Sequence, residues 1–233
     1  MDLWANLPVM IACYGYIVAL ILVAGRLGDH PAVPRGVSRK FLHAMIGNLP
    51  FIMPYFTNSL FPFLVASPFI AVTYLVSPYS PWPGFAMRMR GLSDITEEGH
   101  GTGLILYAVS YSALALLYGT KPYIVAAGVL PMAYGDSVAA LVGTTYGRHR
   151  FRVFEWKSLE GCLGMFIGSL LSLLTGMAYF SMIYGFSLQA QMVQVLVVSV
   201  VVTVAEAVSP RGLDNVTVPA LGALTFIVMG GGA

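Results

Sequence analysis

The chain has 233 residues, of which 58% are hydrophobic and only 9% are charged. Roughly a quarter of the residues in an average soluble protein are charged, so this composition excludes an ordinary soluble domain. The net charge of +2 and the lack of a basic tract also argue against nucleic-acid binding, which needs clustered cations opposite phosphates. We expect one integral-membrane domain over residues 1–233.

Apolar runs of about 20 residues, long enough to cross a bilayer, follow one another along the chain. The first is not preceded by basic residues, and Arg26 follows it instead, so it predicts a retained span rather than a signal peptide. The expected fold is all-α and polytopic, with about eight transmembrane helices. They are predicted near 7–25, 41–57, 59–78, 102–119, 122–144, 161–184, 190–208 and 216–232. Seven spans is the main alternative, because His43, Asn48 and Pro50 interrupt the second run.

The basic residues predict the orientation of these helices, because cytoplasmic loops carry an excess of Lys and Arg. With eight spans, 11 of the 12 basic residues fall on one side, and only Lys121 lies on the other. Most acidic residues lie in or beside the same loops. We therefore expect a multi-pass protein of the cell membrane with its N-terminus outside and its charged loops in the cytoplasm. Chemistry gathered on one face favours an enzyme acting at that interface.

A carboxylate stands inside the fifth apolar run, in the segment Gly135-Asp136-Ser137. An isolated charge at such a position is costly and suggests a function. Pro131 and Gly135 can break the helix just before it and free backbone groups. The residues that follow at helical spacing are small: Ala139, Ala140, Gly143 and Gly147. They would let a helix or a ligand approach the backbone closely, so the alternative to a binding site is a simple packing seam.

A basic segment leads into the sixth apolar run, where Trp156-Lys157-Ser158-Leu159-Glu160-Gly161 is expected to open a helix. Ser158 is a suitable N-cap, and the i,i+3 spacing predicts Lys157 and Glu160 on one helical face. Arg148 and neighbouring cations precede this helix start, where backbone N–H groups and the helix dipole favour phosphate. The segment predicts a phosphate site or, alternatively, a surface ion pair at a helix start.

A polar segment also joins the last two apolar runs and contains Glu206, Asp214 and Asn215. Asp214 and Asn215 precede a helix whose first turn contains Pro219, a favourable position for proline. The alternative interpretation is a capped turn between two spans.

Two further clusters are expected on the same membrane face. They are Arg39, Lys40 and His43 before the second run, and Glu97, Glu98 and His100 before the fourth. His100 beside two glutamates could bind a metal, but no second His or Cys lies at ligand spacing, which disfavours zinc. For each histidine alone, a solvated position at the membrane surface is the alternative.

Carboxylates and cations are thus expected to gather at one membrane face. Carboxylate oxygens together with phosphate suit Mg²⁺, which uses few protein ligands. The residue types predict metal-dependent phosphoryl or nucleotidyl transfer to a lipid. They do not choose the nucleotide, since neither a Walker A motif nor a protein-kinase signature is present. A small transporter or binding scaffold is the alternative class, but a transporter would place ionisable residues near the bilayer centre in two corresponding halves, and the sequence lacks them.

These polar segments resemble the CTP-dependent lipid kinase family, which includes dolichol kinase, phytol kinase and the CTP-using diacylglycerol kinase. The phosphatidate cytidylyltransferases are more widely similar. The matching segments occur in the family's order: RKFLH (39–43), EEGHGT (97–102), GDSVAALVGTTYGRH (135–149), KSLEG (157–161) and EAVSPRGLDNVTVP (206–219).

The resemblance implies CTP as the phosphoryl donor, Mg²⁺ as the cofactor and a long-chain alcohol as the acceptor. The implied catalytic residues are Asp136, Lys157 and His43, with His43 or Asp136 accepting the alcohol proton. The implied nucleotide-binding residues are Gly135, Ser137, Arg148, Lys157, Ser158, Glu160, Asp214 and Asn215. The implied metal ligands are Asp136, Glu160, Glu206 and Asp214, and the further candidates are Arg39, Lys40, Glu97, Glu98 and His100.

We therefore expect a CTP-dependent kinase that phosphorylates a prenol of phytol, geranylgeraniol or dolichol type at the cytoplasmic face. A CTP-dependent diacylglycerol kinase and a cytidylyltransferase that makes a CDP-lipid are the alternatives. Gly-Asp-Ser at 135–137, in place of a double-acidic signature, disfavours the cytidylyltransferase. The expected partners are the bilayer, the lipid alcohol and CTP. Glycine faces can pack within one chain or between two, so a homodimer stays open.

Overall fold

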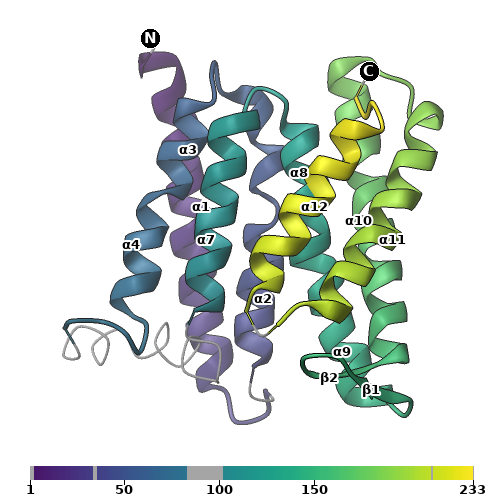
Figure 1. Cartoon of the computed structure of the whole chain (residues 1–233). Helices are drawn as coiled ribbons and strands as arrows, with labels where there is room; N and C mark the ends of the chain where they lie inside the picture. The colour runs from purple at the N-terminus through teal and green to yellow at the C-terminus, as the bar shows by residue number, and fades with distance from the viewer. Residues whose placement is uncertain (1–2, 34–35, 83–101, 211, 233) are drawn as a thin grey trace.

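The computed structural model describes residues 3–33, 36–82, 102–210 and 212–232. Long helices run up and down between two ends of one bundle, and both chain termini lie at the same end (Figure 1). The helices are α1 (Leu3–Asp29), α2 (Val37–Ile46), α3 (Leu60–Ala66), α4 (Pro68–Leu75), α7 (Gly103–Tyr118), α8 (Pro122–Leu130), α9 (Asp136–Tyr146), α10 (Leu159–Tyr184), α11 (Met192–Val208) and α12 (Asp214–Val228). The shorter elements are the 3₁₀ turns η1 (Leu49–Phe51), η2 (Met53–Tyr55) and η4 (Gln189–Gln191), the π-helical turn η3 (Pro131–Gly135), and the strands β1 (Arg150–Arg152) and β2 (Trp156–Ser158).

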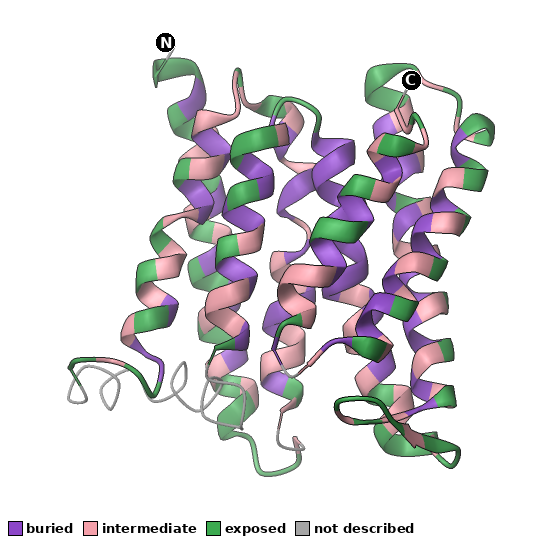
Figure 2. Cartoon of the chain, viewed as in Figure 1, coloured by how far each residue is buried: buried purple, intermediate pink, exposed green. Residues whose placement is uncertain are grey.

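Within the described ranges, four helical segments are long and apolar enough to cross a membrane: Leu3–Asp29, Pro122–Tyr146, Leu159–Tyr184 and Gln189–Val208. Large apolar side chains are exposed along the outer surfaces of the bundle, for example on α1, α10 and α11 (Figure 2). Exposed apolar surface on this scale suits contact with lipid. The expected helical membrane protein is confirmed in this sense.

Two of the expected spans are not continuous helices. The segment predicted at 41–57 consists of α2, which ends at Ile46, followed by η1 and η2. Pro50 and Pro54 open these two 3₁₀ turns, because proline has no N–H to donate and cannot continue a helix. The segment predicted at 59–78 divides into α3 and α4 where Pro68 follows Ser67.

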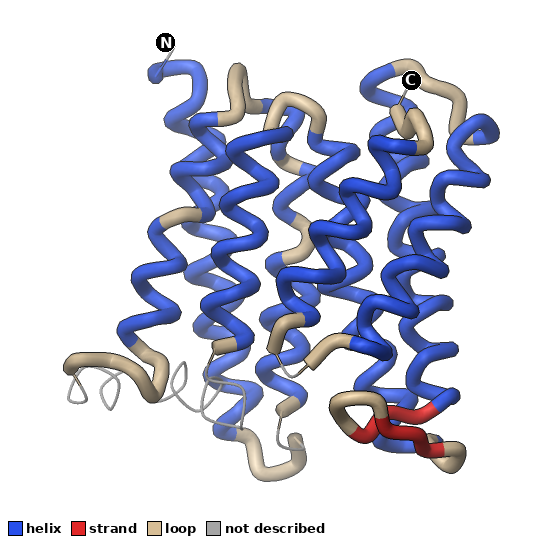
Figure 3. Tube along the Cα trace, viewed as in Figure 1, coloured by secondary structure: helices blue, strands red, loops and turns tan. Residues whose placement is uncertain are grey.

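A small β-hairpin at one end of the bundle adds two short strands to the otherwise helical fold (Figure 3). Strands β1 and β2 pair antiparallel, with Phe151 opposite Lys157. The prediction that Lys157 and Glu160 lie on one helical face was therefore wrong, since Lys157 belongs to β2 and α10 starts only at Leu159. Ser158 is the N-cap of α10, as predicted, and its hydroxyl accepts the N–H of Gly161 at 3.0 Å. Lys157 and Glu160 consequently do not share a helical face.

Helix α8 forms the centre of the bundle. All nine of its residues are buried, and it packs against α7, α10 and α12 (Figure 2). The contact with α12 is close because both helices place a glycine there. A Cβ on Gly222 would meet the carbonyl oxygen of Ala127 at 2.6 Å, and a Cβ on Gly128 would meet the backbone of Pro219.

Glycines of η3 and α9 pack against glycines of α10 within one chain. A Cβ on Gly168 of α10 would lie 3.1 Å from the Cα of Gly135, and one on Gly143 would lie 3.5 Å from the Cα of Gly161. Close backbone approach of α9 and η3 to α10 therefore uses the small residues that would otherwise be available for a partner chain.

Gly135→Ala tests this packing. The added methyl would collide with the Ser169 hydroxyl and would lie 3.2 Å from the Met165 carbonyl oxygen, so we expect a loss of about 1–3 kcal/mol in stability from overpacking. Gly15→Ala is the control, since Gly15 is an exposed α1 residue with no atom within 4 Å of its Cβ position. Thermal unfolding in detergent measures both variants, and equal melting temperatures would contradict the close packing.

Candidate active site

A cavity of about 310 Å³ lies at the hairpin end of the bundle, between α9, the β1–β2 hairpin, α10 and α11. We call it the polar cavity. Four charged side chains line it, each from a different element: Asp136 of α9, Arg150 of β1, Lys157 of β2 and Glu206 of α11. The rest of the lining is Ala139, Ala140, Gly143, Thr144, Trp156, Ser158, Gly161 and Cys162. Small residues from α9 and α10 thus expose backbone to a ligand in the cavity.

Asp136 is the first residue of α9, directly after the π-helical turn η3. Such π-turns relax the helical hydrogen-bond ladder and often occur at functional sites. The Asp136 carboxylate forms an ion pair with the ammonium group of Lys40 from α2. This pair brings the 39–43 segment to the 135–137 segment, although Asp136 and Lys40 are distant in sequence.

Lys157 and Glu206 form a second ion pair in the polar cavity. Glu206 belongs to the last turn of α11, and only 6% of its side chain is exposed, against 20% for Lys157. Burial by itself would lower the pKa of Lys157, but the carboxylates of Glu206, Asp214 and Asp136 together outweigh burial and raise that pKa above its ordinary value. Lys157 is therefore cationic at physiological pH.

His43 lies beside Asp136, buried between α2, η3 and α7. Its Nε2 is 3.0 Å from the carbonyl oxygen of Met132, so this nitrogen carries a proton and donates it. The ring also packs against Tyr107, with a centroid separation of 4.2 Å. Asp136 and Lys40 are near enough for their charges to act on the imidazole. The donated Nε2 proton leaves Nδ1 as the ring nitrogen that can accept one.

The other expected residues of these segments lie near the same place. Ser137 donates its hydroxyl to the Ala133 carbonyl at 2.6 Å and faces the Lys40 carbonyl at 3.5 Å. Asp214 interacts electrostatically with Asp136 and Lys157, while Asn215 donates to the Asp214 carboxylate at 3.0 Å. The buried Nε of Arg39 has no hydrogen-bond partner among the described residues. Glu97, Glu98 and His100 lie outside the described residues.

Glu160 points to the segment between α9 and β1 rather than into the polar cavity. Its carboxylate accepts the backbone N–H groups of Arg148 and His149 at 3.2–3.3 Å, and its Oε1 lies 2.7 Å from the His149 ring nitrogen. Neither Glu160 nor Arg148 lines the cavity. The structure thus gives Glu160 a local contact that differs from the pairing with Lys157 expected from i,i+3 spacing.

Glu160→Gln separates these two interpretations. We expect turnover to fall by less than about tenfold, since the change weakens contacts to the segment between α9 and β1 but removes no group from the polar cavity. A metal ligand would be far more sensitive to the same substitution. Initial rates with saturating substrates measure the effect. A hundredfold or larger loss of turnover would show that Glu160 acts in the active site as a metal ligand.

Sequence reasoning missed Arg150, Thr144, Trp156 and Cys162 as cavity residues. Arg150 is placed by the hairpin, where alternation brings Arg150 and Arg152 to one face of β1. The signal was present in the alternating segment Arg-Phe-Arg before Trp-Lys-Ser, which is typical of short strands. Thr144 and Cys162 follow from the packing of α9 on α10 and carry no separate sequence signal.

No set of three or more His, Cys, Asp or Glu side chains within the described ranges is arranged to enclose a metal ion. Two carboxylates, Asp136 and Glu206, nevertheless line the polar cavity. Mg²⁺ commonly binds through one or two carboxylates together with substrate phosphates and water. The donor set therefore fits a magnesium ion that arrives with a nucleotide better than one held by the protein alone.

Comparison with known proteins identifies the family. No family model and no solved structure matches the chain. The phytol kinase of Synechocystis sp. is 34% identical over 215 residues, which cover 88% of this chain and 84% of that protein. Phytol kinase 1, chloroplastic, of Arabidopsis thaliana is 26% identical over 90% of this chain and 71% of its own length.

The chain belongs to the phytol kinase family. Membership confirms the family resemblance inferred from the polar segments. It also confirms the expected enzyme class, because a kinase transfers a phosphoryl group. The polar cavity, with its cations and carboxylates, is accordingly the candidate active site of a membrane kinase.

Proposed function

We propose that the protein transfers the γ-phosphoryl group of CTP to the hydroxyl of a long-chain prenol such as phytol or geranylgeraniol. The observation that carries the proposal is the pair of lysine–carboxylate contacts, Lys40–Asp136 and Lys157–Glu206, at one end of a helical membrane bundle. Relatives named phytol kinase support a prenol acceptor. Family resemblance supports CTP.

The cations of the polar cavity suit the phosphates of a nucleotide. Phosphoryl transfer requires mainly positioning and charge stabilisation from the protein. Lys157 and Arg150 line the polar cavity and can contact phosphate oxygens, while Lys40 reaches its edge through Asp136. The small residues of α9 and α10 leave room for the nucleotide to approach the backbone.

The carboxylates suit the magnesium ion that accompanies a nucleotide. Asp136 and Glu206 would hold Mg²⁺, with Asp214 close to both ion pairs. When bound, the ion supplies positive charge that stabilises the phosphates during transfer. Each carboxylate has a lysine partner, so a magnesium nucleotide offers a cation to the acids and an anion to the lysines at the same time.

His43 and Asp136 are the two groups that can take the proton of the acceptor hydroxyl. Asp136 is an acceptor in its ionised form, and its contact with Lys40 keeps it ionised. His43 can accept at Nδ1 because Nε2 is committed to Met132. We place the acceptor hydroxyl between His43 and the polar cavity, within reach of both groups.

A labelled-nucleotide assay tests the proposal. Purified protein in detergent receives γ-labelled CTP or γ-labelled ATP with phytol, geranylgeraniol, dolichol, diacylglycerol or phosphatidic acid. Label in the prenol fraction with CTP is the expected result. Label released as pyrophosphate, together with a CDP-lipid, would identify a cytidylyltransferase, and transfer from ATP alone would overturn the CTP assignment.

We further propose eight membrane crossings, with the hairpin end in the cytoplasm and the termini outside. The described basic residues support this orientation, since Arg39, Lys40, Arg150 and Lys157 gather at the hairpin end, while Lys121 precedes α8 at the opposite end (Figure 1).

Cysteine labelling tests the orientation. In a variant with Cys13 and Cys162 replaced by alanine, single cysteines at Asn58 and Ser187 should react with an impermeant reagent in intact cells. A cysteine at Arg150 should react only after the cells are opened. The reverse pattern would invert the topology, and matching reactivity at all three positions would contradict the span count.

A further inference from the structure

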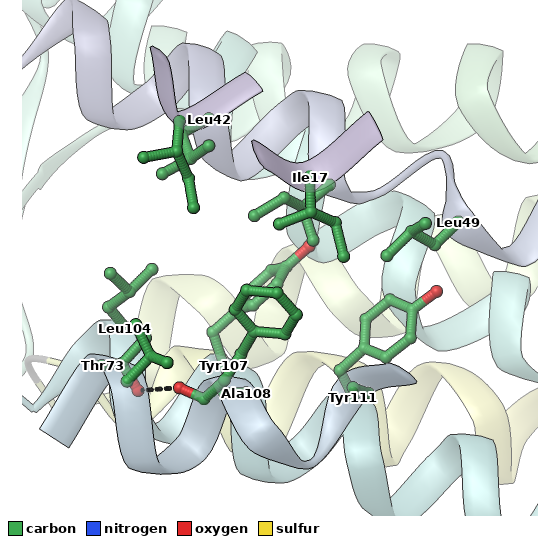
Figure 4. A pocket seen from close by; sticks show the side chains of 13 residues that line it. Ile17, Leu42, Leu49, Thr73, Leu104, Tyr107, Ala108 and Tyr111 are labelled. Carbon is green, nitrogen blue, oxygen red and sulfur yellow. Dashed lines mark hydrogen bonds between the residues drawn. The ribbon is translucent and has the colours of Figure 1, made fainter. Parts of the chain in front are cut away.

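A second cavity, of about 50 Å³, lies inside the other half of the bundle, between α1, α2, α3, α4 and α7 (Figure 4). We call it the apolar cavity. Its wall is made almost entirely of hydrocarbon, including Ile17, Leu42, Leu49 and Leu104. Thr73 is a polar residue in this wall, and its hydroxyl donates to the Phe69 carbonyl at 2.7 Å. The apolar cavity is thus suited to a hydrocarbon chain.

One polar atom in this wall is unsatisfied. The hydroxyl of Tyr111 is buried and has no hydrogen-bond partner among the described residues, and only 3% of Tyr111 is exposed. Its neighbour Tyr107, one helical turn earlier, donates to the His43 carbonyl at 3.3 Å. Figure 4 shows both tyrosine rings on the α7 side of the apolar cavity. A buried donor without a partner is unfavourable. The Tyr111 hydroxyl therefore suggests a ligand whose π electrons can accept a weak hydrogen bond.

Helix α2 connects the apolar cavity with the candidate active site. Leu42 and Ile46 lie on the face of α2 that lines the apolar cavity. Lys40 and His43 lie on the face that meets Asp136 and Met132. Tyr107 belongs to both environments, because it lines the apolar cavity and packs against the His43 ring. Helix α2 and Tyr107 therefore lie between the apolar cavity and Asp136.

We propose that the apolar cavity holds the first part of the isoprenoid chain of the acceptor alcohol. The hydroxyl end passes Tyr107 and His43 toward Asp136, and the double bond of the second isoprene unit lies against the Tyr111 hydroxyl, which donates weakly to its π electrons. The volume is far smaller than a diterpenol, so the rest of the chain extends along the lipid-facing surface. This inference rests on the proposed prenol kinase activity.

Filling the cavity tests the proposal kinetically. Ala108 lines the apolar cavity, and Ala108→Leu should raise KM for geranylgeraniol about tenfold or more, while KM for CTP stays unchanged. The matched control is Ala113→Leu, on an exposed face of the same helix. Tyr111→Phe should raise KM for geranylgeraniol severalfold without affecting an acceptor saturated beyond its allylic bond, such as phytol. Equal kinetic constants for wild type and Ala108→Leu would overturn the proposal.

Photolabelling of the wild-type protein decides the question even if Ala108→Leu does not fold. A geranylgeraniol analogue with a diazirine in its first isoprene units should label peptides from the helices that line the apolar cavity, α1, α2, α3, α4 and α7, and excess unlabelled geranylgeraniol should suppress the labelling. Labelling confined to other helices would overturn the proposed position of the chain. If these peptides are labelled but no alcohol is phosphorylated, the proposed function fails while the chain-binding cavity stands.

Discussion

Asp136→Asn is expected to lower kcat by at least about a hundredfold, because it removes a charge that borders both the nucleotide and the acceptor in the proposed site. The substitution preserves size and leaves the π-helical turn before α9 unchanged. The carboxylate is the partner of Lys40 and lies at the wall of the polar cavity. Turnover with saturating CTP and prenol, measured after confirming normal chromatographic behaviour in detergent, gives the effect.

Asp29→Asn is the matched control, since Asp29 is an exposed carboxylate at the end of α1. It should keep wild-type kinetics. Lys40 loses its charged partner in Asp136→Asn, so the double variant Lys40→Met/Asp136→Asn shows whether an unpaired lysine disturbs the fold. Near-normal turnover of a well-folded Asp136→Asn protein would show that the Asp136 carboxylate has no catalytic role.

Lys157→Met is expected to lower kcat/KM for the nucleotide by about a hundredfold and to destabilise the protein by roughly 3 kcal/mol. The kinetic effect follows from the loss of a cation that can contact phosphate in the polar cavity. The loss of stability follows from Glu206, which is left buried without its ion-pair partner. Steady-state kinetics and thermal unfolding measure the two effects separately.

The double variant Lys157→Met/Glu206→Gln distinguishes a structural pair from a functional one. Removal of both charges should restore most of the stability but none of the activity. Lys121→Met is the control, because Lys121 is an exposed lysine near the opposite end of the bundle. Recovery of activity in the double variant would show that the lysine served the fold alone.

The stability contributed by Lys157 should also depend on pH in a defined direction. The pKa of this lysine is raised in the folded protein, because the charges of Glu206, Asp214 and Asp136 together outweigh burial. The stabilisation is therefore complete below the pKa of an unfolded lysine and is lost as pH rises through the folded-state value. Wild type and Lys157→Met should converge in stability only in strongly alkaline solution.

Much of the helical framework followed from the sequence, because a membrane helix needs a long apolar run and little else. Ser158 was identified as the N-cap of α10, and Pro131 with Gly135 marked the place where the helix before Asp136 departs from regular α geometry. The Lys157–Glu160 pairing failed because it assumed helical spacing where the chain forms a hairpin.

Partners far apart in the sequence could not be assigned from spacing. Lys40 with Asp136, and Lys157 with Glu206, are separated by 96 and 49 residues. In an apolar bundle, the shapes of the side chains decide which helices become neighbours. Residue spacing along the sequence does not reveal those neighbours. The position of Arg150 likewise depends on the hairpin, and the apolar cavity depends on five helices meeting at Tyr111 and its neighbours.

By itself, the sequence determined that this protein is a helical membrane protein whose few charges gather in motifs, since charge is too costly within a bilayer to occur there without a partner or a use. Its polar segments were sufficient to indicate the kinase family. Only the tertiary structure decided which carboxylate each lysine neutralises. It also decided that Glu160 contacts His149, in the segment before β1, and not Lys157. The physical reason is that ion pairs form between groups close in space, and the packing of the helices and the hairpin sets those distances.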